Sequence, residues 1–196
     1  MSRVGKTILK VPSGVQVMHQ TGFVSVSKGN TTLTQEIKGG ITVEVNGDEL
    51  KVLRPNDTRE AKAFHGLYNR LIANMIKGVN EGFKRILILN GVGYRATMKG
   101  QDLSLAIGYS HPIEVKAELG LTFKILSPAE MLAAGLPKDG APVAIEVSGA
   151  SKEKVGAMAS KIRDLRPVEP YHMYGVRYSD ERVRRKESKS GAKGKK

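Results

Sequence analysis

Residues 50–82 read LKVLRPNDTREAKAFHGLYNRLIANMIKGVNEG, which is a short strand, a polar cap and a long helix in succession. After Asp57, apolar side chains recur every three or four residues and predict one apolar face of a helix. Asp57 and Glu60 have the spacing of a helix capping box, and Gly78 and Gly82 are typical of a helix end. The predicted apolar face consists of Ala61, Phe64, Leu67, Leu71, Ile72, Met75, Ile76 and Val79.

Residues 1–56, which precede this helix, alternate apolar and polar side chains in several short runs, such as 23–27 and 41–45. Asn46-Gly47 is the strongest hairpin-turn dipeptide in the chain. Alternation with a period of two is typical of an antiparallel sheet with one buried face. The first part of the chain is therefore predicted to be a sheet covered by one helix.

The same succession recurs near the other end of the chain. Residues 144–147 form a predicted strand, Ser151 can cap a helix, and the apolar face from Val155 to Leu165 ends before Pro167. Further strands are predicted by alternation at 84–89, 103–107, 113–115 and 121–125. A loop rich in Ala, Pro and Gly follows at 127–142, with a helical turn predicted at 129–134.

This recurrence predicts an α+β fold with two similar domains from an internal duplication, each an antiparallel sheet packed against a helix. The predicted division is an N-terminal domain at 1–81, a C-terminal domain at 82–166 and a basic tail at 167–196. The alternative is two unrelated sheet–helix units, because strand, cap and helix are a common sequence of elements.

Composition excludes several classes of function. The 196-residue chain is 40% hydrophobic, so it can bury a core, but it has only 5% aromatic residues and no Trp, which argues against a large aromatic-lined ligand pocket. The absence of Cys excludes disulfides, thiolate catalysis and zinc–thiolate sites. The longest aliphatic run, residues 86–89, is too short to span a membrane, and the first residues show no export signal. These features predict a cytoplasmic protein without a membrane partner.

Positive charge is concentrated toward the C-terminal end. The formal net charge is +13, and residues 163–196 hold eleven Lys or Arg against five Asp or Glu. An excess of cations at one end predicts nucleic acid or an anionic surface as a partner. The alternative is that the charge serves solubility alone.

The stretch from residue 166 to 196 combines these cations with tyrosines and contains little that could form a packed core. Tyr171, Tyr174 and Tyr178 can stack on bases or sugars. The arginines that can bind phosphates through paired hydrogen bonds are Arg166, Arg177, Arg182, Arg184 and Arg185. The alternative is a solvated end whose tyrosines pack back on the second domain, and both interpretations can hold together.

Two glycine motifs resemble phosphate-binding loops. Residues 91–96, GVGYRA, match the dinucleotide form G-x-G-x-x-A, but that site needs a helix to begin there, and the following alternation predicts a hairpin instead. We expect the glycines to bend the strand so that Tyr94 and Arg95 project from it, or to let another backbone come close. Gly5-Lys6-Thr7 lacks the first glycine of a P-loop and indicates a basic N-terminal arm. The four histidines have no metal-ligand spacing, so we expect no cofactor, no metal and no catalytic site.

Several motifs, in order along nearly the whole chain, resemble the bacterial-type ribosomal protein L6 family of the large subunit. They are SRVGK at 2–6, NMIKGV at 74–79 with Gly82-Phe83, GVGYR at 91–95, GYSHP at 108–112, and EPY at 169–171 followed by GVRY at 175–178. Each is weak alone, but together, at family-like spacing, they are highly specific.

The resemblance implies a structural constituent of the large ribosomal subunit that binds rRNA near the sarcin–ricin loop and the stalk base, where translational GTPases dock in passing. Neighbouring ribosomal proteins are further implied partners. It also implies that the second domain and the tail make most of the RNA contact. The chain departs from the family at 172–174, where His-Met-Tyr replaces the usual Lys-Gly-Lys, and at 127–142, where the loop looks longer than usual.

The resulting hypothesis is a non-enzymatic rRNA-binding protein of the cytoplasmic ribosome, with no cofactor and no small-molecule substrate. The alternatives are a general nucleic-acid-binding module outside the ribosome and, less compatible with the hairpin, a dinucleotide-dependent enzyme. The predicted RNA contacts are Arg3, Lys6, Tyr94, Arg95, Ser110, His111, Arg166, Tyr171, His172, Tyr174, Gly175, Arg177, Tyr178, Arg182, Arg184, Arg185, Lys186 and Lys189.

Overall fold

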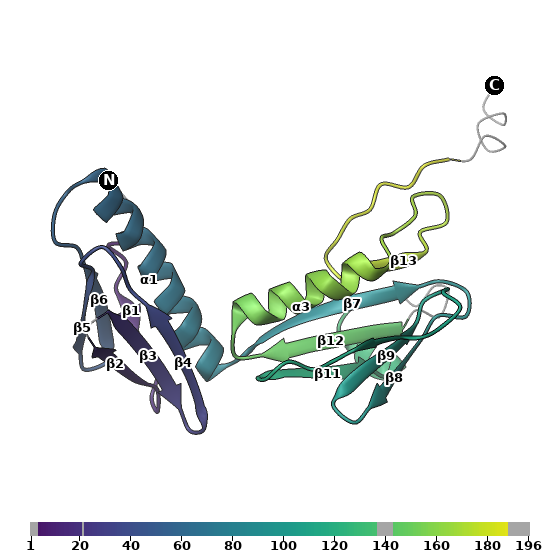
Figure 1. Cartoon of the computed structure of the whole chain (residues 1–196), viewed down its shortest axis with the longest axis horizontal. Coiled ribbons are helices and arrows are strands. Elements are labelled where there is room, and N and C mark those ends of the chain that lie inside the picture. Colours follow the sequence, from purple (N-terminus) through teal and green to yellow (C-terminus); the bar gives the residue numbers. More distant parts are fainter. Residues whose placement is uncertain (1–3, 21, 137–142, 188–196) are drawn as a thin grey trace. The chain divides into compact units, whose positions relative to one another are not determined.

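The computed structural model describes residues 4–20, 22–136 and 143–187 of the chain (Figure 1). The chain forms two compact units. Of the described residues, the first unit holds those as far as Phe83 and Ala150–Lys152, and the second holds those within Lys84–Gly149 and from Glu153 onward. Each unit combines sheets with a helix, so the predicted α+β class is confirmed.

The first unit holds two small antiparallel sheets, where the sequence predicted one. Their orders are β2-β3-β4 and β1-β6-β5. Val26 pairs with Leu33 in the first sheet, and Val43 pairs with Val52 in the second. The predicted turn at Asn46-Gly47 joins β5 to β6, with Gly47 at a φ of 59°. The strands are β1 (Leu9–Lys10), β2 (Gln16–Gln20), β3 (Phe23–Lys28), β4 (Thr31–Glu36), β5 (Thr42–Asn46) and β6 (Glu49–Leu53).

Helix α1 (Arg59–Asn80) covers these sheets, as predicted, and contacts β3, β4 and β6 (Figure 1). Ile72 on the helix and Val24, Val26 and Leu50 on the strands are almost completely buried in one core. Val24 and Val26 point to the same face of β3 because they are two residues apart, whereas Phe23 at the strand start is half exposed. The aliphatic periodicities of the sequence therefore meet in a single hydrophobic core.

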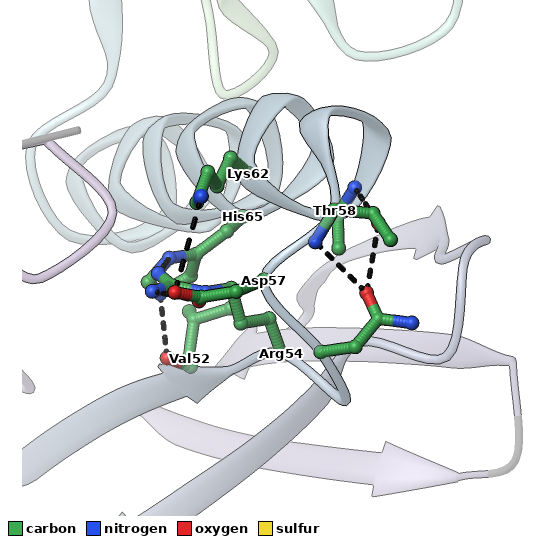
Figure 2. A network of polar contacts seen from close by, with 8 residues as sticks. Val52, Arg54, Asp57, Thr58, Lys62 and His65 are labelled. Carbon is green, nitrogen blue, oxygen red and sulfur yellow. Dashed lines mark hydrogen bonds and ion pairs between the residues drawn. The ribbon is translucent and has the colours of Figure 1, made fainter. Parts of the chain in front are cut away.

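The start of α1 differs by one residue from the prediction. Thr58, not Asp57, is the N-cap, and its hydroxyl accepts a hydrogen bond from the backbone N–H of Ala61 at 3.3 Å. The Asp57 carboxylate instead binds Arg54 at 2.6 Å and lies 3.9 Å from Lys62 (Figure 2). These ion pairs hold the pKa of Asp57 below its ordinary value, with the hydrogen bond from Arg54 as the main cause.

His65 fixes α1 to the end of β6. Its ring is 5% exposed, with Nε2 2.8 Å from the Val52 carbonyl and Nδ1 3.0 Å from Nη1 of Arg54 (Figure 2). Because a carbonyl only accepts and a guanidinium only donates, Nε2 carries the proton and Nδ1 is the acceptor. His65 is therefore a packing residue, and its ring also lies against Gly5.

The second unit contains a four-stranded sheet in the order β11-β12-β7-β13 and a three-stranded sheet in the order β10-β9-β8. Helix α3 (Lys152–Leu165) runs along the four-stranded sheet in Figure 1 and buries Val155, Met158, Ala159 and Ile162. The short helix α2 (Pro128–Ala133) matches the predicted helical turn and begins with a capping box between Ser127 and Glu130. The strands are β7 (Phe83–Asn90), β8 (Arg95–Lys99), β9 (Asp102–Ala106), β10 (Ile113–Val115), β11 (Leu121–Leu126), β12 (Val143–Gly149) and β13 (Gly175–Tyr178).

Strand β13 was not expected, because the sequence placed all residues after 166 in a tail without a packed core. In the structure Val176 pairs with Leu89 of β7 and is completely buried. Gly175 allows the chain to enter this strand, since its φ is 139° and an added Cβ would lie 2.7 Å from the Pro167 carbonyl oxygen. Residues 175–178 are therefore the edge strand of the second unit and not part of a free tail.

The GVGYRA motif leads into a hairpin and not into a helix. Strand β8 begins at Arg95 and pairs with β9 up to Lys99 and Asp102. With no helix starting at Ala96, the pyrophosphate of a dinucleotide would have no helix N-terminus to bind. The prediction that this motif forms a glycine-bent hairpin is confirmed.

Candidate nucleic-acid interface

The main candidate interface is built on a closed loop at residues 169–174, here called the ring loop (Figure 1, the yellow-green loop near β13). The backbone N–H of Glu169 donates to the Tyr174 carbonyl at 2.8 Å, and that of Met173 donates to the Glu169 carbonyl at 3.0 Å. Asn90, at the end of β7, donates its side-chain N–H to the Met173 carbonyl at 3.0 Å. The loop is thus closed by its own backbone and tied to the sheet.

The Glu169 carboxylate caps this loop from within. It accepts the backbone N–H of His172 at 2.8 Å and that of Tyr171 at 3.0 Å. These bonds favour the ionised carboxylate, and the His172 N–H is the main cause that lowers the pKa of Glu169 from its ordinary value of 4.5. An acidic residue within a basic region therefore binds the backbone of its own loop.

The outer surface of the ring loop carries aromatic rings. The rings of His172 and Tyr174 are stacked, with centroids 5.6 Å apart and an interplanar angle of 21°. Both are exposed, the His172 side chain by 71% and Tyr174 by 41%, and Tyr171 is 45% exposed. Met173, which lies between His172 and Tyr174 in the sequence, has a φ of 64°. This is the left-handed conformation that non-glycine residues seldom adopt.

Residues 182–186, here called the basic segment, run back along the ring loop. The backbone N–H of Lys186 donates to the Pro170 carbonyl at 3.0 Å, and Nε of Arg185 donates to the Tyr171 carbonyl at 3.2 Å. Arg182, Arg184, Arg185 and Lys186 are exposed, and none forms an ion pair with another residue of the described chain. A segment with four exposed cations therefore runs beside the loop that carries the exposed rings.

The GVGYR turn lies next to the base of the ring loop, because Asn90 immediately precedes it. The Tyr94 ring packs over Gly91, where an added Cβ would lie 2.7 Å from the ring, and it also lies near Gly108. Tyr94 is half-buried by this packing, while Arg95 is exposed. Of the two side chains expected to project, Arg95 alone does so fully.

Arg166 joins this neighbourhood through Tyr109. Its guanidinium lies 5.1 Å from the centroid of the Tyr109 ring, and the Tyr109 hydroxyl donates to the Leu165 carbonyl at 2.9 Å. Hydrogen bonding to Tyr109 raises the pKa of Arg166, and the nearby Tyr94 acts in the same direction. Ser110 and His111, which follow Tyr109, are exposed, with Ser110 Oγ 3.4 Å from His111 Nδ1.

Three predicted contacts are occupied within the protein instead. Tyr178 lies between two guanidiniums, with Arg85 5.6 Å and Arg163 5.8 Å from its ring centroid. Arg177 is half-buried, and its Nη1 lies 3.4 Å from the Glu181 carbonyl. Gly175 is buried at the start of β13. The structure thus gives these residues roles in holding β13.

Glu181 joins Arg163 of α3 to Tyr178 at the end of β13. Its carboxylate binds Arg163 through two bonds of 2.6 and 2.9 Å and accepts the backbone N–H of Tyr178 at 3.2 Å. The bonds to Arg163 are the main cause that lowers the pKa of Glu181, and they raise the pKa of Arg163 in turn. The chain from Tyr178 to Glu181 is therefore fixed to α3.

Three predicted contacts remain, Lys6, Arg3 and Lys189. Lys6 belongs to the first unit, where it lines a cavity of about 580 Å³ together with Arg54 and His65. Arg3 and Lys189 lie outside the described residues. Four other residues support the interface and were not singled out from sequence: Asn90, Tyr109, Glu169 and Glu181. Tyr109 lies in the GYSHP motif and Glu169 in the EPY motif, so the sequence did indicate these two positions. No motif or local pattern indicates Asn90 or Glu181.

No other type of site is found in the part of the chain that the structure describes. Within residues 4–20, 22–136 and 143–187, no three His, Asp or Glu side chains come together as a metal site would require. Across these residues there is also no helix with the length and apolarity needed to cross a membrane. The interface is thus composed of rings, cations and backbone.

Comparison with known proteins gives the family. A model of the family described as ribosomal protein L6 matches residues 11–82 and 90–179. A large ribosomal subunit protein uL6 from Moorella thermoacetica is 42% identical over 194 residues, which covers 99% of this chain and 98% of the relative. Another from Staphylococcus saprophyticus is 44% identical over 191 residues, covering 97% and 99%, and one from Herpetosiphon aurantiacus is 41% identical over 194 residues, covering 98% and 100%. With both units matched and relatives aligned from end to end, the chain belongs to the ribosomal protein L6 family.

Proposed function

We propose that the chain is a structural rRNA-binding component of the large ribosomal subunit and that it contacts rRNA mainly through the ring loop and the basic segment. Proteins of this family are ribosomal proteins of the bacterial cytoplasm and not enzymes, and the relatives carry the name of the large subunit. The single observation that carries the proposed contact is that the basic segment is hydrogen-bonded to the ring loop. This segment has four exposed cations without carboxylate partners in the described chain, and the loop carries exposed rings.

The chemistry of this surface suits folded RNA. Phosphates would bind the guanidiniums of Arg182, Arg184 and Arg185, and unstacked bases or riboses would meet the rings of Tyr171 and Tyr174. Arg95 adds a cation on the neighbouring hairpin. The loop is already closed by hydrogen bonds, so little conformational entropy is lost when RNA orders it further.

The finer location rests on the resemblance described above. We propose that the docking site is the region of large-subunit rRNA near the sarcin–ricin loop, where translational GTPases bind in passing, with ribosomal proteins as neighbours. In this proposal the protein acts by position, because it holds a rigid surface against folded RNA and reads shape and phosphates more than base sequence.

The test is charge reversal of the basic segment. The triple variant Arg184→Glu, Arg185→Glu and Lys186→Glu is expected to bind deproteinised large-subunit rRNA about 100-fold more weakly at physiological salt. The slope of log affinity against log salt concentration should fall by about 2 to 3, since each lost phosphate contact removes about 0.7–0.9. Filter binding over a salt series measures both quantities.

The matched control applies the same change of net charge to the first unit. Lys38→Glu, Lys51→Glu and Lys77→Glu alter three exposed side chains that form only long ion pairs of 3.5, 3.9 and 4.0 Å. An equal loss of affinity in both triple variants would show that total charge, not the proposed surface, determines binding. Equal affinity of the unaltered protein for unrelated RNA and DNA would favour a general nucleic-acid-binding module.

A further inference from the structure

The ring loop contains a stacked pair of rings, His172 and Tyr174, that its own hydrogen bonds do not require. Tyr178, Tyr109 and Tyr94 each have ring contacts within the second unit, with Arg85 and Arg163, with Arg166, and with Gly91 and Gly108. The His172–Tyr174 pair differs because its two rings are stacked on each other, and the stack as a whole is exposed, the His172 side chain by 71% and Tyr174 by 41%. A stack of two rings with exposed surface has the form of a platform on which a further planar group can be placed.

The backbone below the pair is held in an uncommon conformation. Met173 lies between the two ring-bearing residues in the sequence and has a φ of 64°, a left-handed conformation that is unfavourable for a residue with a side chain. Bonds from Asn90 to the Met173 carbonyl and from Met173 N–H to the Glu169 carbonyl keep it there. Strain that the surrounding structure maintains is frequent at binding sites, where it presents side chains in advance of the ligand.

The charges next to the pair indicate what the planar group would carry. Glu169 is engaged with the backbone N–H groups of Tyr171 and His172, and Nδ1 of His172 lies 3.3 Å from it. Arg185 reaches the Tyr171 carbonyl with Nε, so its guanidinium lies beside the loop. A planar group linked to an anion fits this surface, and a nucleobase attached to its phosphate has both features.

We propose that the His172–Tyr174 pair is a stacking platform for one unpaired nucleobase of RNA, with Arg185 binding the phosphate next to that base. This inference rests on the proposed rRNA-binding function and adds to it a base-dependent contact. It also assigns a role to positions 172–174, where the chain departs from the Lys-Gly-Lys pattern that the resemblance implies. Here a ring contact with a base replaces two cationic contacts with phosphates.

The experiment compares two single-stranded probes with the full-length protein. One is a ten-nucleotide oligoadenylate RNA, and the other has the same sugar-phosphate backbone with all bases removed. The unaltered protein is expected to bind the oligoadenylate about tenfold more tightly, because one of its bases can stack on the aromatic pair. Titration at low salt by fluorescence anisotropy gives both affinities.

Variants then assign the difference to the ring pair. Tyr174→Leu should abolish the preference for the oligoadenylate and leave the affinity for the base-free probe unchanged, whereas Tyr174→Phe should retain the preference because the ring remains. Phe23→Leu is the matched control, since Phe23 is a 50% exposed ring on β3 of the first unit. Retained preference in Tyr174→Leu, or equal affinity of the unaltered protein for both probes, would overturn the platform.

A parallel titration with deproteinised large-subunit rRNA separates this inference from the proposed function. If the protein binds that rRNA but shows no preference between the two probes, the platform is wrong and the proposed function stands. If it binds neither the rRNA nor the probes, both are wrong.

Discussion

Two pairs of stacked rings occur in the described chain, one in each unit, and they lie in opposite environments. In α1, Phe64 and Tyr68 have centroids 5.9 Å apart at 26°, and in the ring loop His172 and Tyr174 have centroids 5.6 Å apart at 21°. Tyr68 is 5% exposed and Tyr174 is 41% exposed. Ring geometry is therefore nearly the same in both pairs, and burial is what distinguishes a core contact from a candidate binding surface.

The hydrogen bonds around the two ring pairs also differ between the two units. The Tyr68 hydroxyl accepts the backbone N–H of Lys38 at 2.9 Å, and His65, one turn earlier, bonds to the Val52 carbonyl and Arg54. In the ring loop, backbone bonds and the Glu169 carboxylate hold the chain, so the rings of His172 and Tyr174 are not needed to satisfy it. The first unit uses His65 and Tyr68 to close its own structure, whereas in the ring loop of the second unit His172 and Tyr174 stay exposed.

The largest difference should appear when one Tyr of each pair is truncated. Tyr68→Ala is expected to lower the free energy of unfolding by about 3–5 kcal/mol, because it removes a core ring and leaves the Lys38 N–H without its acceptor. Tyr174→Ala should change it by less than about 0.5 kcal/mol, as expected for an exposed residue. Urea unfolding followed by circular dichroism measures both values.

In RNA binding the two variants should differ in the opposite sense. Tyr174→Ala should have a lower affinity for rRNA than the unaltered protein, and Tyr68→Ala should have an unchanged affinity under conditions where it is folded. Tyr68→Phe is the control for the hydroxyl alone and should cost about 1 kcal/mol. Similar unfolding free energies for Tyr68→Ala and Tyr174→Ala would contradict the distinction by burial.

The first unit was predicted well because its determinants are local. Alternation in 23–27 and 41–45, the Asn46-Gly47 turn and the periodicity after Asp57 each involve neighbours within a few residues, and all appear in β3, β5 and α1. The cap moved from Asp57 to Thr58 because both residue types cap helices, and only Thr58 has the Ala61 N–H within reach. Local patterns thus fixed the elements but not the choice between adjacent caps.

The candidate interface was less predictable because it depends on contacts between distant parts of the chain. Strand β13 has only four residues, too few for a recognisable alternating pattern, and its partner β7 lies in another part of the sequence. Once β13 forms, Tyr178 meets Arg85 and Arg163, so a ring that looked available for stacking is enclosed. The residue types of the C-terminal stretch predicted a nucleic-acid surface. The pairing of β13 with β7 determines which of its tyrosines stay exposed, and the sequence did not predict that pairing.

A smaller effect is expected from the strained residue between the exposed rings. Met173→Gly should be more stable than Met173→Ala by about 1 kcal/mol, because glycine adopts a φ of 64° without the steric cost that a Cβ brings. At an ordinary position the order is reversed, with glycine less stable by about 0.5–1 kcal/mol. Both variants lose the Met side chain, so their difference in urea unfolding isolates the backbone conformation. A less stable glycine variant would contradict the left-handed conformation of residue 173.

The smallest effect concerns pH and the carboxylate that holds the exposed pair in place. The pKa of Glu169 is below 4.5 in the folded loop, mainly because the His172 N–H binds the ionised form. A group with a lowered folded-state pKa stabilises the protein fully above its unfolded-state value, and this contribution is lost as the pH falls through the folded-state pKa. The backbone amide signals of Tyr171 and His172 in NMR spectra should therefore shift below pH 4.5, while those of Lys38 and Ala61 in the first unit should not follow the same titration. Glu169→Gln should remove the step, since the amide does not ionise. A step of unchanged midpoint in Glu169→Gln would show that another group titrates there and that the ring loop is held by its backbone bonds alone.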